Sequence, residues 1–137
     1  MIKNFKELRE RVKSSRPLVV SVAAAADTEL LLAVKAAVDD GFIQPVLTGD
    51  KEKIEDICRQ INLVPTEILG AETETEAVER AVREVHNGNA QVLMKGLVNT
   101  SIYMRGILNR EWGLRTGRLL SMMAAYEAPG YHMLLFC

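Results

Sequence analysis

The sequence predicts a three-layer α/β/α fold with a mainly parallel sheet. Short apolar runs of the strand type alternate along the chain with amphipathic segments of helical length, and this order produces parallel strands joined by right-handed crossovers. The strand-type runs lack regular polar alternation, which is typical of strands buried on both faces. A chain of 137 residues can bury one hydrophobic core without disulfides or metal ions.

The chain is expected to begin with a surface helix that leads into the first strand. Phe5, Leu8 and Val12 recur at helical spacing among charged residues, and the pattern breaks at residues 14–17. Residues 18–23 form a β-branched run without polar alternation. They predict a strand that is buried on both faces.

A helix and a second strand–helix pair follow. Asp27 is placed to cap the first of these helices, and Gly41 suits the left-handed position just after its last turn. Residues 43–47 are typical of a strand, with Gly49 and Asp50 as the turn and the cap of the next helix. The apolar inner face of that helix consists of Ile54, Ile57, Cys58 and Ile61.

A third unit of the same kind is predicted between residues 66 and 94. Residues 66–69 form a short strand candidate, and residues 73–76, Thr-Glu-Thr-Glu, match a capping box. The helix behind this box ends at residues 86–89, and residues 91–94 predict another buried strand. The apolar stripe of the helix consists of Ala77, Val78, Ala81, Val82 and Val85.

The end of the chain predicts a helix and then an antiparallel hairpin. Helical spacing resumes around Ile102 and Leu108, and residues 119–126 and 131–137 are strand-like runs joined by the turn signal Glu-Ala-Pro-Gly. The last run is apolar and has no polar tail or covering helix. We therefore expect a truncated domain; a complete protein with a central, covered last strand is the alternative.

Composition excludes several classes of function. The formal net charge of −1 gives no global field for collecting nucleic acid or anionic membrane, so any anion site must be local. No apolar run is long enough to span a bilayer, and the mixed charges at the N-terminus do not resemble a signal peptide. A cytoplasmic protein is expected, with Cys58 and Cys137 as free thiols.

A candidate anion site lies where the strand at 91–94 gives way to the next helix. Open α/β sheets bind ligands at the carboxyl ends of their strands, and a helix start adds N–H donors and a positive dipole. Lys95 stands at that strand end, and residues 99–101 are capping-type residues at the start of the next helix. Arg105 shares a helix face with Ser101, so both cations can approach one anion. The candidate residues are Lys95, Gly96, Asn99, Thr100, Ser101 and Arg105.

A second candidate segment precedes the strand predicted at 119–126. Arg115 and Arg118 flank a glycine that would let the backbone approach a ligand, and arginines can hold a phosphoryl group. Arg118 and Ser121 are the candidate residues here. A solvated loop, with its arginines paired to nearby glutamates, is the open alternative.

These segments carry a resemblance to a known family. The chain closely resembles phosphate butyryltransferases, and thus the phosphate acetyl/butyryl transferase family, collinearly over its whole length. The matching segments are residues 20–25, 47–50, 94–101 with Arg105, 113–121, 129–131 and 134–136.

The resemblance implies a fold, a size and an activity. Family members are about twice as long and resemble isocitrate and isopropylmalate dehydrogenases in fold, so residues 1–137 would be the N-terminal part of such a domain, without its C-terminal half. They convert acyl-CoA and phosphate to acyl phosphate and CoA, with CoA as a substrate and no cofactor or metal. This implies small-molecule substrates. The residues that act on the CoA thiol belong largely to the C-terminal half, so none is assigned here and the chain alone is expected to be weakly active or inactive.

Other features favour structural roles. His86 is placed at a helix C-terminus, Cys58 lies on an apolar helix face, and His132 falls in the last strand; the histidines and cysteines lack zinc-site spacing, so no metal site is expected. The methionines are interpreted as packing residues, although some could line an acyl pocket. Neither a Walker A loop nor a Gly-x-Gly-x-x-Gly fingerprint is present.

Three alternatives to a phosphate butyryltransferase stay open. They are a non-catalytic acyl-CoA or anion-binding module, a degenerate remnant, and a phosphate acetyltransferase-type domain of a longer bifunctional enzyme. In every case the exposed apolar surface predicts a homo-oligomer.

Overall fold

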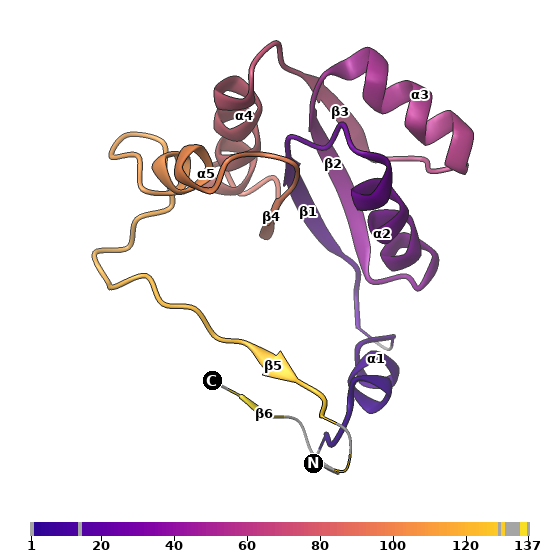
Figure 1. The fold of residues 1–137 in the computed structure, drawn as a ribbon. Helices are drawn as coiled ribbons and strands as arrows, with labels where there is room; N and C mark the ends of the chain where they lie inside the picture. The colour runs from indigo at the N-terminus through magenta and orange to yellow at the C-terminus, as the bar shows by residue number, and fades with distance from the viewer. Residues whose placement is uncertain (1, 14, 129, 131–134, 137) are drawn as a thin grey trace. The chain divides into compact units, whose positions relative to one another are not determined.

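The computed structural model describes residues 2–13, 15–128, 130, 135 and 136. The chain divides into two compact units. The core unit is Pro17–Thr116, and the flanking unit is made of Met1–Arg16 together with Gly117–Cys137. Figure 1 shows the succession of helices and strands.

The core unit is built on a parallel sheet. Its strands are β1 (Leu18–Ala23), β2 (Ile43–Gly49), β3 (Glu67–Gly70) and β4 (Val92–Lys95), in the spatial order β3-β2-β1-β4. Each neighbouring pair is parallel. The predicted parallel sheet is thus confirmed, and every strand of the core unit ends at the same edge.

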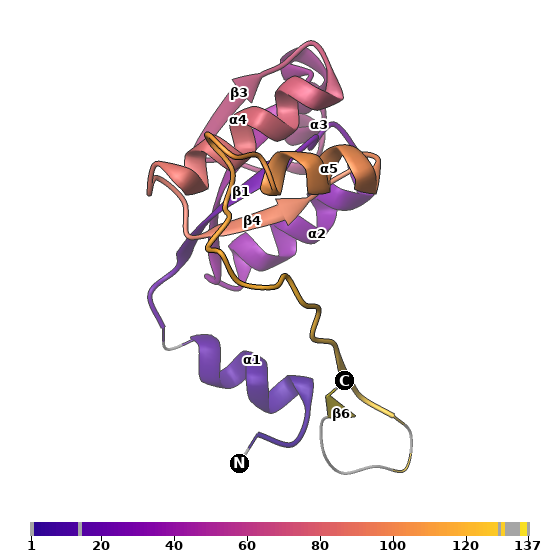
Figure 2. The same cartoon turned by 90° about the vertical axis from the view of Figure 1, so that its left-hand side faces the viewer.

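Helices cover both faces of this sheet. Helices α2 (Thr28–Asp39) and α3 (Lys51–Ile61) supply buried residues to one hydrophobic cluster with β1 and β2. Helices α4 (Glu74–His86) and α5 (Thr100–Ile107) contribute to a second cluster on the opposite side, as Figures 1 and 2 show. The predicted α/β/α layering is confirmed.

Alternation along the central strands directs side chains to the two faces. Val20, Val22 and Leu47 belong to the cluster beneath α2 and α3. The hydroxyls between them point the other way: Ser21 Oγ donates to Ala81 O at 3.0 Å, and Thr48 Oγ1 lies 2.8 Å from Ala77 O. The opposite face is therefore joined to α4 by two buried hydrogen bonds, in addition to apolar packing.

The helix ends follow the capping residues predicted from sequence. The side chains of Asp27, Asp50 and Thr73 each accept a hydrogen bond from a first-turn N–H of the following helix. Gly41 has φ 77°, as expected for the left-handed residue after α2. Local chemistry thus sets these boundaries.

Strand β4 departs from the prediction of a buried strand. It lies at the edge of the sheet, and Val92 and Lys95 are exposed at its two ends. An apolar run has the same appearance in a central strand and in an edge strand that is covered on its faces, so sequence periodicity could not distinguish them. Lys95 therefore lies at an open edge of the sheet.

The flanking unit contains α1 (Phe5–Lys13), β5 (Ala125–Tyr126) and β6 (Leu135–Phe136). Helix α1 lies where sequence predicts it and has no buried residue. At its start, Asn4 Oδ1 accepts from Glu7 N at 2.8 Å, and Phe5 N donates to Glu127 Oε1 at 2.6 Å. These bonds cap the helix.

The antiparallel hairpin is confirmed only in part. Ala125 pairs with Phe136 and Tyr126 with Leu135, but residues 119–124 are not in a strand. Leu119 and Met122 are 93% and 86% exposed, so the prediction of a strand through this segment, and of Met122 as a packing residue, is wrong. Residues 131–134 and Cys137 lie outside the described residues, and so does the prediction for His132.

No helix among the described residues combines the length and hydropathy that a membrane span requires.

Candidate functional site

The carboxyl edge of the core sheet collects the loops that can bind a ligand. Because the four strands are parallel, the segments that follow them meet at this edge. Each leads directly into the start of a helix, so backbone N–H groups and helix dipoles are directed to the same side. This edge is the candidate functional site.

Lys95 and Gly96 form the junction between β4 and the loop before α5. Lys95 is the last residue of β4 and is exposed, with its Nζ 3.5 Å from Gly96 O. Gly96 N donates to Ala23 O at 2.9 Å, and Leu97 N donates to Ala24 O at 3.0 Å. A Cβ at Gly96 would overlap the carbonyl oxygens of Ala23 and Ala24, so the loop can lie against the end of β1 only because residue 96 has no side chain.

Asn99 caps helix α5. Its Oδ1 accepts from Ser101 N at 2.8 Å and from Ser101 Oγ at 2.7 Å. The prediction of capping-type residues at this helix start is therefore confirmed for Asn99. The same bonds fix the Ser101 side chain beside the cap, at the positive end of the helix dipole.

Thr100 and Arg105 complete the group on the core unit. Both are exposed, and Arg105 lies one helical turn after Ser101. Thr100 adds a hydroxyl at the helix N-terminus, next to the strand end that carries Lys95, and Arg105 adds a positive charge in the last turn of the same helix. Donors and positive charge of this kind suit a phosphate or a carboxylate.

Arg118 and Ser121 lie in the flanking unit, and both are exposed. The residues around them are not in a strand. Their part in ligand binding stays a prediction.

A cavity of about 240 Å³ at the same edge was not predicted. It lies beside the starts of α3 and α4, and its lining includes Asp50, Lys53, Thr73, Ala77 and Leu97. The sequence did contain a signal, since each strand is followed by a capping residue. The local sequence pattern identifies those residues as caps alone, whereas the parallel strands bring the caps together at one edge.

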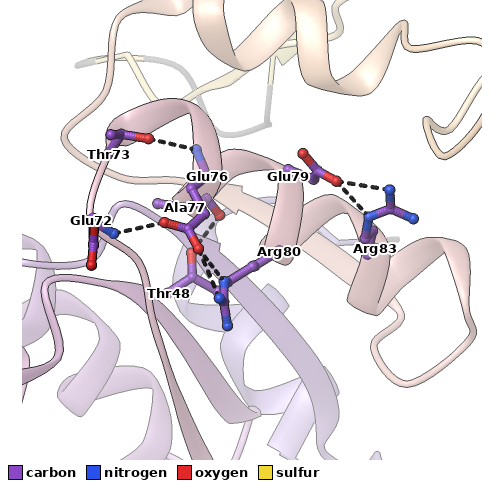
Figure 3. Close-up of polar contacts among 8 residues, drawn as sticks. All are labelled: Thr48, Glu72, Thr73, Glu76, Ala77, Glu79, Arg80 and Arg83. Atoms are coloured by element: carbon purple, nitrogen blue, oxygen red, sulfur yellow. Dashed lines mark hydrogen bonds and ion pairs between the residues drawn. The ribbon is translucent and has the colours of Figure 1, made fainter.

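The start of α4 is held by a local network, which Figure 3 shows. Thr73 Oγ1 accepts from Glu76 N at 3.2 Å, as a capping box requires. Glu76 Oε2, however, accepts from Glu72 N at 2.8 Å, one residue before the expected donor. That hydrogen bond, followed by the one from Arg80, lowers the pKa of the Glu76 carboxyl.

Burial favours the neutral form of two titratable groups. Burial raises the pKa of the Tyr103 phenol, which lies 3.4 Å from Leu93 O. Burial, and then the nearby Glu55 carboxylate, raise the pKa of the Cys58 thiol. Cys58 is buried in the core as predicted, where a thiol is a weak nucleophile. Among the described residues, no group of three or more histidine, cysteine or acidic residues is placed to hold a metal ion.

Fold and site together define an open-sheet α/β domain with an anion-compatible edge. Comparisons with known proteins identify its relatives. No protein-family model matches the chain. It is 42% identical over 138 residues to a phosphate butyryltransferase of Clostridium beijerinckii, covering 99% of this chain and 46% of the relative. It is 31% identical over 132 residues to a phosphate acetyltransferase of Rickettsia typhi, covering 93% of this chain and 38% of the relative.

A solved structure agrees with these relatives. A branched-chain phosphotransacylase from Enterococcus faecalis V583 superposes with a TM-score of 0.69 and 25% sequence identity, covering 87% of this chain and 41% of that one. The chain belongs to the phosphate acetyl/butyryl transferase family, which confirms the resemblance stated above. It spans about half the length of the curated relatives it matches.

Proposed function

We propose that the protein is a phosphate acyltransferase of the butyryltransferase kind, which converts acyl-CoA and phosphate to acyl phosphate and CoA. The closer sequence match to a phosphate butyryltransferase than to a phosphate acetyltransferase supports a butyryl-type acyl group. Residues 1–137 would supply one α/β half of the substrate cleft, because the chain spans about half of its relatives.

The reaction explains why an anion-binding edge is needed. A phosphate oxygen attacks the carbonyl carbon of the thioester, the carbon–sulfur bond breaks, and the CoA thiolate leaves and takes up a proton. Phosphate must be held in position for the attack, and negative charge develops on the acyl oxygen. Preorganised N–H donors and cations lower the barrier for both reasons.

The observation that carries the proposal is the β4–α5 junction. It places Lys95 at a strand end, beside a capped helix that presents Thr100, Ser101 and Arg105. We assign these four residues to the phosphate side of the cleft. Gly96 and Asn99 shape the backbone there, and Arg118 and Ser121 are proposed as further phosphate-binding residues on the basis of the sequence.

The first test measures phosphate binding by the 137-residue chain. Titration with inorganic phosphate, followed by ³¹P NMR, should show weak binding that Lys95→Ala and Arg105→Ala each reduce. Arg59→Ala is the matched control, because it removes an exposed arginine on α3 that pairs with Asp56. Equal phosphate affinity in all four proteins would contradict the assigned site.

The second test measures turnover. The chain alone, supplied with butyryl-CoA and phosphate, should release little CoA, because the groups that act on the thiol are expected outside it. Robust CoA release would show that the catalytic groups had been misplaced. Binding of butyryl-CoA without any turnover, even in a protein that extends beyond residue 137, would favour the non-catalytic binding module.

Two further properties belong to the proposal. Exposed apolar side chains such as Leu119 and Met122 support a homo-oligomer; a clean monomer in size-exclusion chromatography would count against it. A cytoplasmic location is proposed as well, and cell fractionation would test it.

A further inference from the structure

Helix α5 carries much of the proposed phosphate site but has little support of its own. It has eight residues, of which Gly106 alone is buried. Isolated helices of this length are unstable in water, so tertiary contacts must hold it. Its orientation decides where Ser101 and Arg105 point, which raises the question of which residues set that orientation.

The first contact is a close approach between α5 and α4. A Cβ at Gly106 would overlap Val78 Cγ1, and it would lie 3.6 Å from Val82 Cγ2 and 3.7 Å from Trp112 Cζ3. The absent side chain lets the two helices meet, as Figure 2 shows. Close contact alone still permits α5 to rotate about the crossing point.

The second contact comes from the loop that follows α5 and returns over α4. Trp112 is half-buried against the second hydrophobic cluster. Asn109 Oδ1 accepts from Glu111 N at 2.8 Å and from Trp112 N at 3.0 Å, which folds the loop tightly after the helix. Leu114 N donates to Ile107 O at 2.8 Å and returns the chain to the helix end.

Two side chains of α4 clamp this loop. The Arg83 guanidinium carbon lies 5.3 Å from the centre of the Trp112 ring, within the range of a cation–π contact. Glu79 Oε1 accepts from Arg83 Nε at 2.8 Å and holds the guanidinium in place, as Figure 3 shows. One turn further along, His86 Nδ1 lies 2.9 Å from Gly113 O. A carbonyl oxygen can only accept, so Nδ1 carries the proton in this contact.

We propose that Trp112, Arg83 and His86 are positioning residues for the phosphate site. They fasten the C-terminal end of α5 to α4, and so fix the direction in which the helix presents Ser101 and Arg105. None of the three belongs to the group proposed to bind phosphate. The inference rests on the proposed function for the identity of the ligand, whereas the clamp itself can be tested without a ligand.

The test compares substitutions at His86, whose side chain is exposed. His86→Leu removes the donor to Gly113 O, while His86→Asn places an amide N–H at nearly the same position as Nδ1. Trp112→Ala removes the ring, and Arg59→Ala on α3 serves as the control. Hydrogen exchange of the α5 amides, including Tyr103 N, which donates to Asn99 O at 3.1 Å, reports the order of the helix. ³¹P NMR titration with inorganic phosphate reports binding.

We expect His86→Leu to raise the α5 exchange rates and weaken phosphate binding roughly five-fold, the equivalent of about one hydrogen bond. Trp112→Ala should have a larger effect, and His86→Asn should restore both quantities. Unchanged phosphate affinity in His86→Leu and Trp112→Ala would refute the inference alone, whether or not α5 exchange changed. Failure of the unsubstituted chain to bind phosphate would refute the proposed function, and the link to phosphate with it. If, in addition, the hydrogen exchange of the α5 amides were the same in His86→Leu and Trp112→Ala as in the unsubstituted chain, the proposed fastening of α5 to α4 would be refuted as well.

Discussion

Gly96→Ala tests whether the candidate site depends on backbone contact. The added methyl group would overlap the carbonyl oxygens of Ala23 and Ala24 and would lie 2.9 Å from Leu30 Cδ2. Backbone oxygens cannot rotate away as a side chain can, so the β4–α5 connection must move. That connection is held by two hydrogen bonds, from Gly96 N and Leu97 N, of 2.9 and 3.0 Å.

The expected magnitude follows from those two bonds. Each intramolecular hydrogen bond contributes about 1 kcal/mol, so separating both costs about 2 kcal/mol. Alanine lowers the entropy of the unfolded chain, which offsets the loss by about 0.4–1 kcal/mol. We therefore expect a net loss of about 1–2 kcal/mol in the free energy of unfolding.

The assay is urea denaturation followed by the fluorescence of Trp112, the one tryptophan of the chain. Gly70→Ala is the matched control at the end of β3. Its φ lies outside the left-handed region, and its Cβ would meet only Lys51, at 3.4 Å or more. That variant should be as stable as the wild type, or more stable by up to about 1 kcal/mol. If Gly96→Ala unfolded at the urea midpoint of Gly70→Ala, the loop at Lys95–Asn99 would not be fixed by contact with β1.

Three further predictions concern the core unit. Thr48→Val keeps the side-chain shape but removes the buried hydroxyl 2.8 Å from Ala77 O, and should cost about 1 kcal/mol in urea denaturation; an unchanged midpoint would show that the hydroxyl adds nothing. The pKa of the Glu76 carboxyl is lowered in the folded state, so the ionised carboxylate stabilises the fold above the unfolded pKa near 4.5, and this stabilisation is lost as pH falls through the folded pKa. The difference in melting temperature between the wild type and Glu76→Gln should therefore shrink in acid. A difference that does not depend on pH would be evidence against this role of Glu76. Burial raises the pKa of the Cys58 thiol above its ordinary 9.0. The contribution of the buried thiol to stability is therefore complete below pH 9.0 and is lost as pH rises through the pKa of the folded state. In a Cys137→Ser background, its alkylation at pH 8 should be slow until urea unfolds the chain, and rapid alkylation of the folded chain would contradict the burial.

Much of the local structure followed from the sequence. The apolar runs located β1 to β4, and Asp27, Asp50, Thr73 and Asn99 marked the helix starts, because strand burial and capping depend on residues within a few positions of each other. The family resemblance could also be recognised from the sequence, because the residues between Lys95 and Arg105 that carry it are neighbours along the chain.

What required the tertiary structure was the relation between distant segments. The order β3-β2-β1-β4 made β4 an edge strand, and strand order is a long-range property that periodicity does not encode. The apolar run at 119–124 matched a strand, but a strand needs a pairing partner as well as a pattern, and only Ala125 and Tyr126 have one there.

The sequence by itself thus determined the elements, their caps and the segment that is proposed to bind an anion. The tertiary structure decided that Gly96 must be glycine, because the carbonyl oxygens of Ala23 and Ala24, at the end of β1 and just after it, occupy the space of a side chain. It also decided that Trp112, Arg83 and His86 hold α5, since residues about 30 positions apart along the chain meet only when α4 and α5 pack on the same face of the sheet.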